Sequence, residues 1–436
     1  MTLHQKCIKC GKDYRINRII YKCEKCGSLL DVIHDIEQLK ELNLKELFNK
    51  RWKSREFPYM SGVWRYKELI LPIENVYIIS RPEGNTNLYA SQILSDYTGC
   101  KWLKLKHEGE NPTGSFKDRG MTTGVTQAKV VGSRVVACAS TGNTSASLAA
   151  YGRFGGFRVI IFIPEGKIAY GKLSQALAYG AMTFQVRGNF DDAMSLVQEA
   201  SADLNLYLLN SVNAFRLEGQ KSIVFELLQQ LNWEVPDWLV CPGGNLGNSS
   251  AFGKGFKELQ DLGIISSVPK VAIIQAAGSN PLYLSYKTDF KEHIEVENPD
   301  TIATAIKIGK PVNYTKAVRT IRWTNGIVEQ VTEQEILDAK AQVDGAGIGA
   351  EPASCATVAG IKKLVEMGVI DKKDKVTGIL TGNLLKDPDA TINYHLDKIP
   401  NIKPKFANKP IVIDANLDSL KKALKGALPE QVYVID

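Results

Sequence analysis

Short β-rich runs alternate with amphipathic helical segments from about residue 75 of this 436-residue chain. Strands are expected at residues 134–139, 157–163, 238–241, 271–275 and 376–380, and helices at 144–153, 169–179 and 249–261. This alternation predicts an α/β fold with mostly parallel sheets. Ligands bind such sheets where strand C-termini meet helix N-termini, so a site is expected in the loops that follow the strands.

One lysine lies in a segment with strong turn signals, Asn111-Pro-Thr-Gly-Ser-Phe-Lys-Asp-Arg-Gly120. We expect a helix to begin just before Lys117, with Ser115 as its cap and Gly114 in the preceding turn. An ammonium group near the positive end of a helix, held in a tight turn, loses its proton more easily than one on the surface. Lys117 therefore suits an amine that forms a Schiff base.

Two loops after expected strands are suited to anions. Ser140-Thr-Gly-Asn-Thr-Ser145 offers hydroxyls and free N–H groups that fit a substrate carboxylate, and the Asn143 amide could bond a phenolic oxygen. Pro242-Gly-Gly-Asn-Leu-Gly-Asn248 has three glycines, which let the backbone wrap a phosphate at the start of the next helix. It is not a Walker loop, because no Gly-Lys-Ser/Thr closes it. Each loop alone also fits an ordinary turn.

A third loop, Leu380-Thr-Gly-Asn383, follows the expected strand at 376–380. The Thr381 hydroxyl can bond a ring nitrogen without forcing that nitrogen to be protonated, although a simple strand-ending turn is the alternative. A reactive lysine, a phosphate loop, a partner for a pyridine nitrogen, a partner for a phenol and a carboxylate site together indicate pyridoxal phosphate with a bound amino acid.

Four of the eight cysteines lie in the first 34 residues, as Cys7-x2-Cys10 and Cys23-x2-Cys26, and each pair is followed by a glycine. Two thiolate pairs separated by a short hairpin fit a tetrahedral zinc ion. The alternative is a degenerate ribbon that folds without metal. Residues 35–60 follow with a charged helical pattern.

Charge and composition exclude several classes of protein. The net charge is +7, and residues 1–26 contribute seven basic and two acidic groups, or +5. This basic patch lacks the long basic run or aromatic ladder of a nucleic-acid site, which makes nucleic acid an unexpected partner. The sequence has no apolar run of 18 residues and no apolar core of a signal peptide near its start, so we expect a cytoplasmic protein with no membrane partner.

The chain resembles the threonine synthases, within the tryptophan-synthase-β-like fold of pyridoxal phosphate enzymes. The resemblance spans nearly the whole sequence, and the lysine segment is its most specific part. The other matching motifs are Trp64-Arg-Tyr66, Glu83-Gly-Asn-Thr86, Ser140 to Ser147, Asn210-Ser-Val-Asn213, Arg216-Leu-Glu-Gly-Gln220, Ala303 to Gly309, Glu351-Pro-Ala353, Thr381-Gly382 and Lys386-Asp-Pro388. A zinc-ribbon-like start also occurs in microbial members of this family.

The resemblance implies a role for each matching position. Lys117 would hold pyridoxal phosphate covalently and shuttle protons, with Phe116 beside the cofactor. Asn143 would bond the phenolic oxygen and Thr381 the pyridine nitrogen. The cofactor phosphate would bind Gly243, Gly244, Asn245, Leu246, Gly247 and Asn248. Ser140, Thr141 and Asn143 would line the substrate carboxylate. Thr144, Ser211 and Arg216 would bind the substrate's phosphate, because an arginine fork with hydroxyls suits a phosphate dianion.

The implied reaction turns O-phospho-L-homoserine and water into L-threonine and phosphate, in an enzyme that is a homodimer by family default. The alternatives that share the cofactor are a synthase joining O-phosphoserine to a sulfur nucleophile and a serine/threonine dehydratase; a zinc-ribbon binding protein is the alternative of another class. Departures from the family pattern occur at Asn87, Ala214, Asn383, Leu384 and Cys355, and none removes a cofactor contact.

The expected domain organisation is two α/β lobes with small appended units. Its boundaries are a zinc-ribbon-like unit at 1–34, the first part of the large lobe at 35–114, a small lobe at 115–205, the rest of the large lobe at 206–400, and a tail at 401–436. The tail is expected to contain a strand at 411–413 and a helix at 417–428, docked on the body. The cofactor would lie between the lobes.

Overall fold

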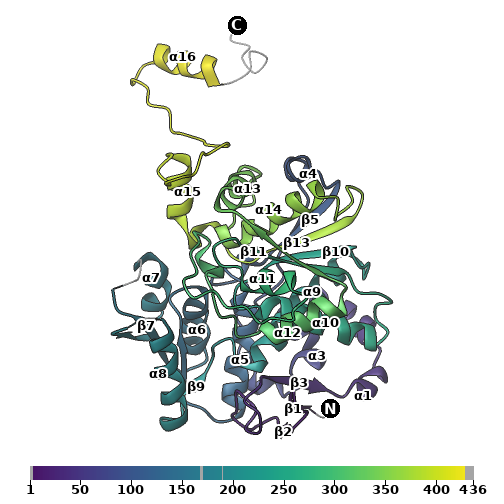
Figure 1. Cartoon of the computed structure of the whole chain (residues 1–436). Coiled ribbons are helices and arrows are strands. Elements are labelled where there is room, and N and C mark those ends of the chain that lie inside the picture. The colour runs from purple at the N-terminus through teal and green to yellow at the C-terminus, as the bar shows by residue number, and fades with distance from the viewer. Residues whose placement is uncertain (1–2, 167–169, 189, 428–436) are drawn as a thin grey trace.

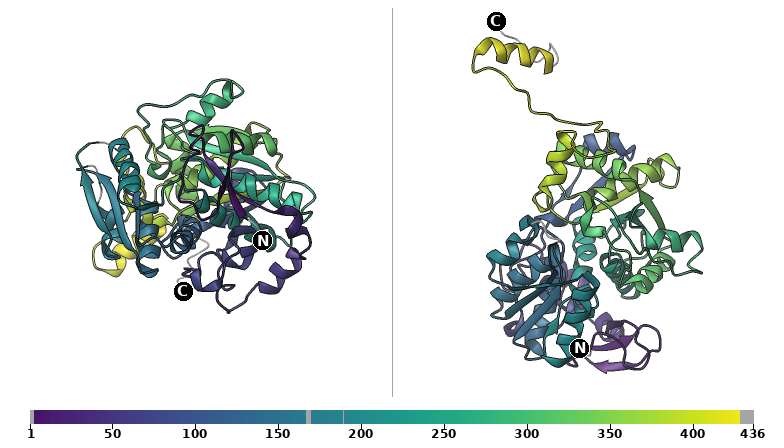
Figure 2. Two further views of the ribbon diagram at one scale, coloured as in Figure 1. Left: turned by 90° about the horizontal axis from the view of Figure 1, so that it is seen from below. Right: turned by 60° about the vertical axis from the view of Figure 1, so that its left-hand side comes forward.

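The computed structural model describes residues 3–166, 170–188 and 190–427 (Figure 1). Two separate, mostly parallel sheets organise the body, and a small antiparallel sheet lies at the N-terminus. Figure 2 shows the two parallel sheets side by side, with the N-terminal unit beneath them and the C-terminal tail extending away. The predicted α/β class is thereby confirmed.

The larger sheet contains six strands, all parallel except β4 at one edge. Their order is β12 (Ile327–Val331), β11 (Lys270–Ala276), β10 (Trp238–Pro242), β13 (Lys375–Leu380), β5 (Trp102–His107) and β4 (Leu88–Tyr89). Within the described residues, three of these strands match runs expected from the sequence to within two residues at each end. Apolar side chains fill both faces, as is typical of a parallel sheet covered by helices on each side.

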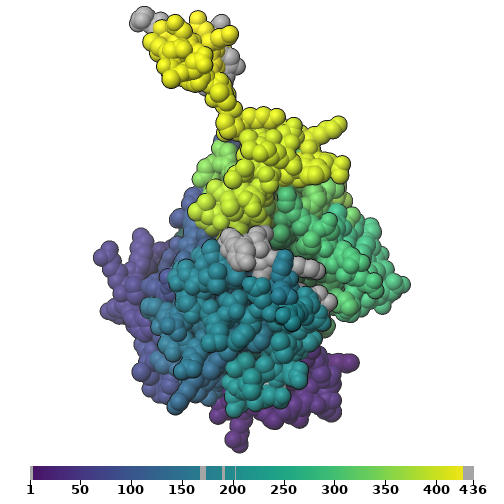
Figure 3. Space-filling model, turned by 90° about the vertical axis from the view of Figure 1, so that its left-hand side faces the viewer, coloured from purple at the N-terminus to yellow at the C-terminus, as the bar shows by residue number. Residues whose placement is uncertain are grey.

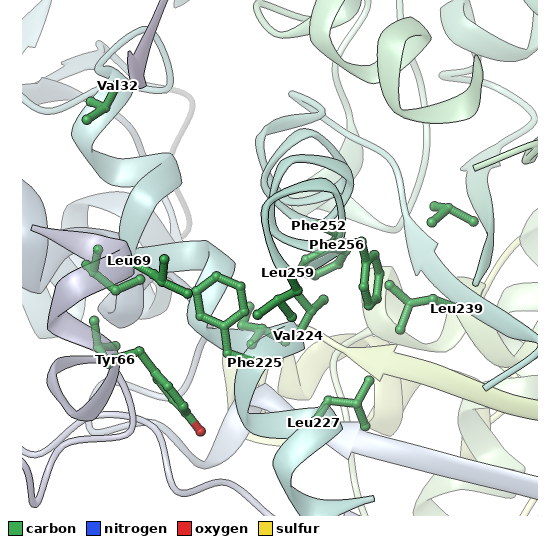
Figure 4. Packing of buried hydrophobic residues seen from close by; sticks show 14 of the residues in the cluster. Val32, Tyr66, Leu69, Val224, Phe225, Leu227, Leu239, Phe252, Phe256 and Leu259 are labelled. Atoms are coloured by element: carbon green, nitrogen blue, oxygen red, sulfur yellow. The ribbon is translucent and has the colours of Figure 1, made fainter. Parts of the chain in front are cut away.

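Alternate residues of β10 pack against different sets of helices. Leu239 and Cys241 face α9 (Ala214–Gln230), α10 (Gly247–Asp261) and α12 (Tyr314–Trp323). Figure 4 shows this cluster, in which Leu239 lies near Phe256 and Leu259 of α10. Trp238 and Val240 face α13 (Glu333–Gly345), α14 (Pro352–Glu366) and α4 (Gln92–Thr98). Because alternate side chains of a strand point to opposite faces of the sheet, β10 contributes to the hydrophobic core on each face.

The smaller sheet is wholly parallel. Its order is β8 (Met182–Val186), β7 (Arg158–Pro164), β6 (Val135–Ala139) and β9 (Tyr207–Leu208). One face packs on α5 (Lys117–Val130), α6 (Asn143–Phe154) and α7 (Tyr170–Ala178), and the other on α8 (Phe190–Asp203). Tyr21 and Leu29 of the N-terminal unit also pack on the α8 face. Residue 169, the first of an expected helix, lies outside the described residues.

The N-terminal unit is a three-stranded antiparallel sheet in the order β2 (Asp13–Arg15), β1 (Leu3–Cys7), β3 (Leu30–His34). Helices α1 (Ile36–Lys40) and α2 (Leu44–Arg51) follow it. The expectation of helix through residue 60 is wrong for its second half. Lys53 adopts a left-handed backbone conformation, and Pro58 lacks the N–H that a helix interior requires.

The remaining elements connect the sheets or cover their edges. They are η1 (Trp64–Tyr66), α3 (Lys67–Ile70), η2 (Asn75–Tyr77), η3 (Glu108–Glu110), α11 (Pro281–Lys287), η4 (Thr304–Ile306), η5 (Leu384–Lys386) and α15 (Pro388–His395). Across the described ranges, none of the helices combines the length and apolarity needed to cross a membrane.

The tail differs from its expectation. Residues 411–413 are exposed and form no strand, and α16 (Leu417–Ala427) lies away from the body (Figures 1 and 3). Ile411, Val412 and Ile413 have a strand-like composition, but no neighbouring strand offers them hydrogen bonds. The expected helix is present to the last described residue, 427, whereas the expected docking on the body is not seen.

Candidate active site

The predicted lysine segment forms a turn that ends in α5. The helix begins at Lys117 with Phe116 as N-cap, and no side chain caps it. The expectation that Ser115 caps the helix is wrong, since the Ser115 hydroxyl has no hydrogen-bond partner. Asp118 fastens the turn instead, because its carboxylate accepts bonds from the Thr113 N–H at 2.7 Å and the Thr113 hydroxyl at 2.6 Å.

Lys117 has the electrostatic setting of a reactive amine. Burial and the nearby Arg216 guanidinium lower the pKa of Lys117 to about 7, against an opposing effect of Glu351. Its Nζ lies 4.1 Å from the centre of the Phe116 ring. A lysine with this pKa is largely a neutral amine slightly above neutral pH, which is the form that attacks a carbonyl carbon.

The lysine turn is joined to the end of β13 by backbone contacts. The Phe116 N–H donates to the Thr381 carbonyl at 3.0 Å, and the Asn383 N–H donates to the Gly114 carbonyl at 2.9 Å. Ser115 and Gly382 form an antiparallel bridge between these bonds. The predicted Thr381 is therefore held beside the lysine turn, and its hydroxyl lies 3.0 Å from the Ser354 hydroxyl.

Asn143 has a partner that the sequence did not assign. It is the first residue of α6, and its amide nitrogen donates to both Glu351 carboxylate oxygens, at 3.2 and 3.1 Å. Burial raises the pKa of Glu351, while the bond from Asn143 opposes the rise. A Cβ on Gly382 would lie 2.3 Å from Glu351 Oε1, so glycine is required there for the carboxylate to approach.

The predicted phosphate loop runs from the end of β10 to the start of α10. Leu246 adopts a left-handed conformation, with φ of 60°. A Cβ on Gly243 would lie 2.6 Å from Ile273 Cγ2, which explains the glycine there. Both polar atoms of the Asn248 side chain and the Gln220 amide oxygen are buried without a partner. Such orphaned groups beside the free N–H groups of a helix start fit a bound phosphate.

The residues expected to bind the substrate lie together at one end of the smaller sheet. The Asn210 side chain bonds the backbone N–H and carbonyl of Ala139, at 3.0 and 2.9 Å, which brings the neighbours Ser211 and Ser140 together. The Arg216 Nη1 donates to the Leu209 carbonyl at 2.9 Å.

The Arg216 guanidinium is a buried cation whose Nε has no partner. Burial lowers its pKa to about 10, and among the described residues no carboxylate forms an ion pair with it. A buried charge in this state calls for an anion. The predicted Thr141 and Thr144 lie in the same partly exposed loop and first turn as Asn143, at the end of β6.

Asn313 connects the two sheets and was also missed. Its side-chain nitrogen donates to the Ser211 carbonyl at 3.1 Å and to the Asn245 carbonyl at 3.4 Å, and its backbone N–H donates to the same Asn245 oxygen at 3.2 Å. Asn313 has no sequence signal except its place just before a helix. For Glu351, the signal was the Glu-Pro pair at a helix start.

The four N-terminal cysteines lie together, with all four sulfurs within 4.8 Å of one another. The Cys7–Cys26 and Cys10–Cys23 sulfur separations are 3.4 and 3.5 Å. Four sulfurs at about 2.3 Å from a tetrahedral zinc would be separated by about 3.8 Å, so the cluster fits the ion closely. Backbone N–H groups of Lys9 and Cys10 also point at Cys7 Sγ, which stabilises a thiolate.

Comparison with known proteins identifies the class. The model of the family described as pyridoxal-phosphate dependent enzyme matches residues 79–382, and the chain belongs to this family. The residues present fit the cofactor, through the low-pKa lysine, the glycine loop and the orphaned polar groups. In the solved structure of Escherichia coli threonine synthase, 98% of this chain superposes on the whole of that chain with a TM-score of 0.65 at 16% identity, which shows the shared fold.

Curated relatives narrow the assignment within that family. The chain is 48% identical to threonine synthase of Methanocaldococcus jannaschii over 97% of its own length and 99% of the relative's. It is also 48% identical to that of Methanosarcina acetivorans, with the same coverage, and 41% identical to chloroplastic threonine synthase 2 of Arabidopsis thaliana. The chain is therefore an enzyme of the threonine synthase family.

Proposed function

We propose that this enzyme converts O-phospho-L-homoserine and water into L-threonine and phosphate. The observation that carries the substrate class is Arg216, a buried guanidinium near the Lys117 amine without an acidic partner among the described residues. A substrate phosphate supplies the missing anion through charge-assisted hydrogen bonds. An unphosphorylated substrate would leave this charge unpaired, which argues against a simple dehydratase.

The groups of this chain divide the work of the reaction. When bound, pyridoxal phosphate supplies a ring that withdraws electrons from the substrate's α-carbon. The Lys117 amine would carry the cofactor, accept protons from the substrate's α- and β-carbons, and return protons to the γ-carbon and then the α-carbon. Glycines Gly243, Gly244 and Gly247, with Asn245, Leu246 and Asn248, would hold the cofactor phosphate.

The remaining groups would orient the cofactor ring and the substrate. Asn143, fixed by Glu351, would bond the phenolic oxygen, and Thr381 the ring nitrogen. Ser140 and Thr141 would bind the substrate carboxylate, and Thr144, Ser211 and Arg216 its phosphate. Release of phosphate from the γ-carbon and addition of water at the β-carbon then give threonine.

The test is incubation of the cofactor-loaded protein with O-phospho-L-homoserine, with phosphate and threonine measured together. Equal amounts of both are expected. Phosphate with 2-oxobutyrate would mean that water addition fails. No turnover with the cofactor still bound would overturn the proposal and direct the search to O-phosphoserine with a sulfur nucleophile.

We infer that Cys7, Cys10, Cys23 and Cys26 hold a structural zinc ion, on the basis of their sulfur geometry. Metal analysis should find about one zinc per chain in the wild type and much less in Cys10→Ser. Equal zinc contents in the two proteins would refute the site.

We also infer a cytoplasmic homodimer. The eight cysteines are all free thiols, which suits a reducing compartment, and the dimer rests on the family resemblance. Measurement of the molar mass in solution tests the dimer. No membrane or nucleic-acid partner is proposed.

A further inference from the structure

The third strand of the cysteine unit, β3, lies against three helices of the body through buried charged groups. We call this set the β3 clamp; its members are Asp31, His34, Glu218, Lys221, Lys254, Glu258 and Lys316. Two residues come from β3, and the others come from α9, α10 and α12. Val32, between Asp31 and His34 in β3, belongs to the same apolar cluster as Phe225 and Phe252 (Figure 4).

Lysines of the body reach the backbone of β3 as well as its side chains. Lys316 Nζ donates to the Leu30 carbonyl at 2.7 Å and pairs with Asp31 at 2.9 Å. Lys254 Nζ donates to the Val32 carbonyl and pairs with Glu218. The His34 ring lies 2.9 Å from the same Glu218 carboxylate. Successive residues of β3 are thus bound by body side chains.

His34, Glu218 and Glu258 bring their ligand atoms within 4.8 Å of one another, which is the spacing of a metal site. The Lys221 ammonium already lies between the carboxylates, at 2.6 Å from Glu218 and 2.5 Å from Glu258. The cation position is therefore taken by a lysine. The cluster joins parts of the protein and is not a second metal centre.

The same three helices begin at the ligand site. Lys254 follows the start of α10 at Gly247 by seven residues, or about 10 Å along the helix axis. Lys316 follows Asn313 by three residues, and Asn313 bonds the loop residue Asn245. On α9, Glu218 is two residues after Arg216. Each helix thus has the phosphate loop or a substrate group at its N-terminus and a clamp residue within the next two turns.

We propose that the β3 clamp positions the phosphate loop, so that the cysteine unit sets the affinity of the enzyme for its cofactor. Lys254 and Lys316 are positioning residues that lie outside the phosphate loop and act on it through Gly247 and Asn245. The inference rests on the proposed phosphate loop but not on the choice of amino-acid substrate. Helices pinned at β3 keep the loop's N–H groups aimed at one phosphate position.

The test measures cofactor affinity in Lys316→Met and Lys254→Met, by titrating the apo-protein with pyridoxal phosphate and following its absorbance. The matched control is Lys257→Met, the same substitution on α10 at a partly exposed position, where the lysine pairs with Asp261. We expect the dissociation constant to rise roughly 2- to 30-fold in the clamp variants and to stay unchanged in the control. Asp31→Asn serves if a lysine variant does not fold.

Thermal unfolding of each apo-protein separates positioning from general damage. Clamp variants that are destabilised but bind the cofactor as tightly as Lys257→Met would overturn the inference. Weaker binding by a variant that remains folded at the temperature of the titration supports it. The titration requires no threonine formation, so a failed substrate assay would overturn the proposed reaction and leave this result standing.

Discussion

Two buried polar regions lie on the same helices and are organised in opposite ways. In the β3 clamp every charge has a counter-charge, as Glu218 has in Lys221 and Lys254. At the first residues of two of those helices, Arg216 of α9 and Asn248 of α10 keep polar atoms without partners. A buried polar group without a hydrogen-bond or charge partner lowers the stability of the fold. The fully paired clamp therefore has a structural role, and the unpaired groups of Arg216 and Asn248 indicate a ligand site. The completeness of pairing, more than burial, separates a binding site from a structural junction.

The largest expected effect is in the region whose polar groups lack partners. Lys117→Ala removes the amine that attaches the cofactor and moves protons, so turnover should fall by about 10²- to 10⁴-fold or more. The stability of the apo-protein should not fall, because the wild-type amine forms no ion pair with any residue that the structure describes, and nothing offsets the cost of its burial. Turnover and thermal unfolding of the same preparation check both points. Retained turnover would remove Lys117 from the active site.

The next effect is in the β3 clamp. Glu218→Gln removes the negative charge that pairs with the buried ammonium groups of Lys221 and Lys254. The free energy of unfolding should therefore fall by about 3–5 kcal/mol. Denaturant titration measures this, with Glu234→Gln as control, because Glu234 pairs with Lys375 at the surface and should change stability by about 0–1 kcal/mol. Equal effects in the two variants would show that the clamp is not a structural junction.

Substitution of Arg216 should lower kcat/KM and leave the free energy of unfolding nearly unchanged. Arg216→Met removes a charge-assisted bond worth about 1.5–3 kcal/mol, so kcat/KM for the phosphorylated substrate should fall about 10- to 150-fold. Arg216→Lys keeps the charge without the two-pronged geometry and should recover part of the loss. Steady-state kinetics of both variants provide the measurement. A large drop in stability with unchanged kcat/KM would place Arg216 among the structural groups instead.

The smallest effect concerns pH. The pKa of Lys117 is lowered to about 7 in the folded protein, so its neutral amine forms as pH rises through that value. The rate at which apo-protein attaches the cofactor should increase about tenfold between pH 6 and 8 and then level off. Rapid-mixing absorbance measurements test this. A rate that keeps rising towards pH 10 would indicate an ordinary, solvated lysine.

The parts of the site that follow local sequence rules could be predicted. Lys117, the Gly243–Asn248 loop and Thr381 lie next to strand or helix ends, and turn signals with strand periodicity locate such positions. Ser115 failed as a cap because its segment is bound to residues 381–383, more than 260 positions away. A competing tertiary contact overrides a local capping preference.

Partners distant in sequence could not be predicted. Glu351 meets Asn143 across 208 positions, and Asn313 joins loops from two different sheets. The β3 clamp likewise consists of ordinary charged residues on amphipathic helices, whose pattern resembles that of a solvated face. These residues form buried ion pairs because a separate N-terminal unit packs over them, and the local sequence pattern does not predict where that unit lies.

The backbone bridge between Ser115 and Gly382 has a consequence for protein synthesis. The smaller sheet is complete once residue 208 has left the ribosome, but the turn that holds Lys117 needs the strand end at Thr381. A nascent chain can therefore fold one lobe early while its reactive amine remains without the surroundings that lower its pKa. Capture of the cofactor becomes a late event, coupled to completion of most of the polypeptide.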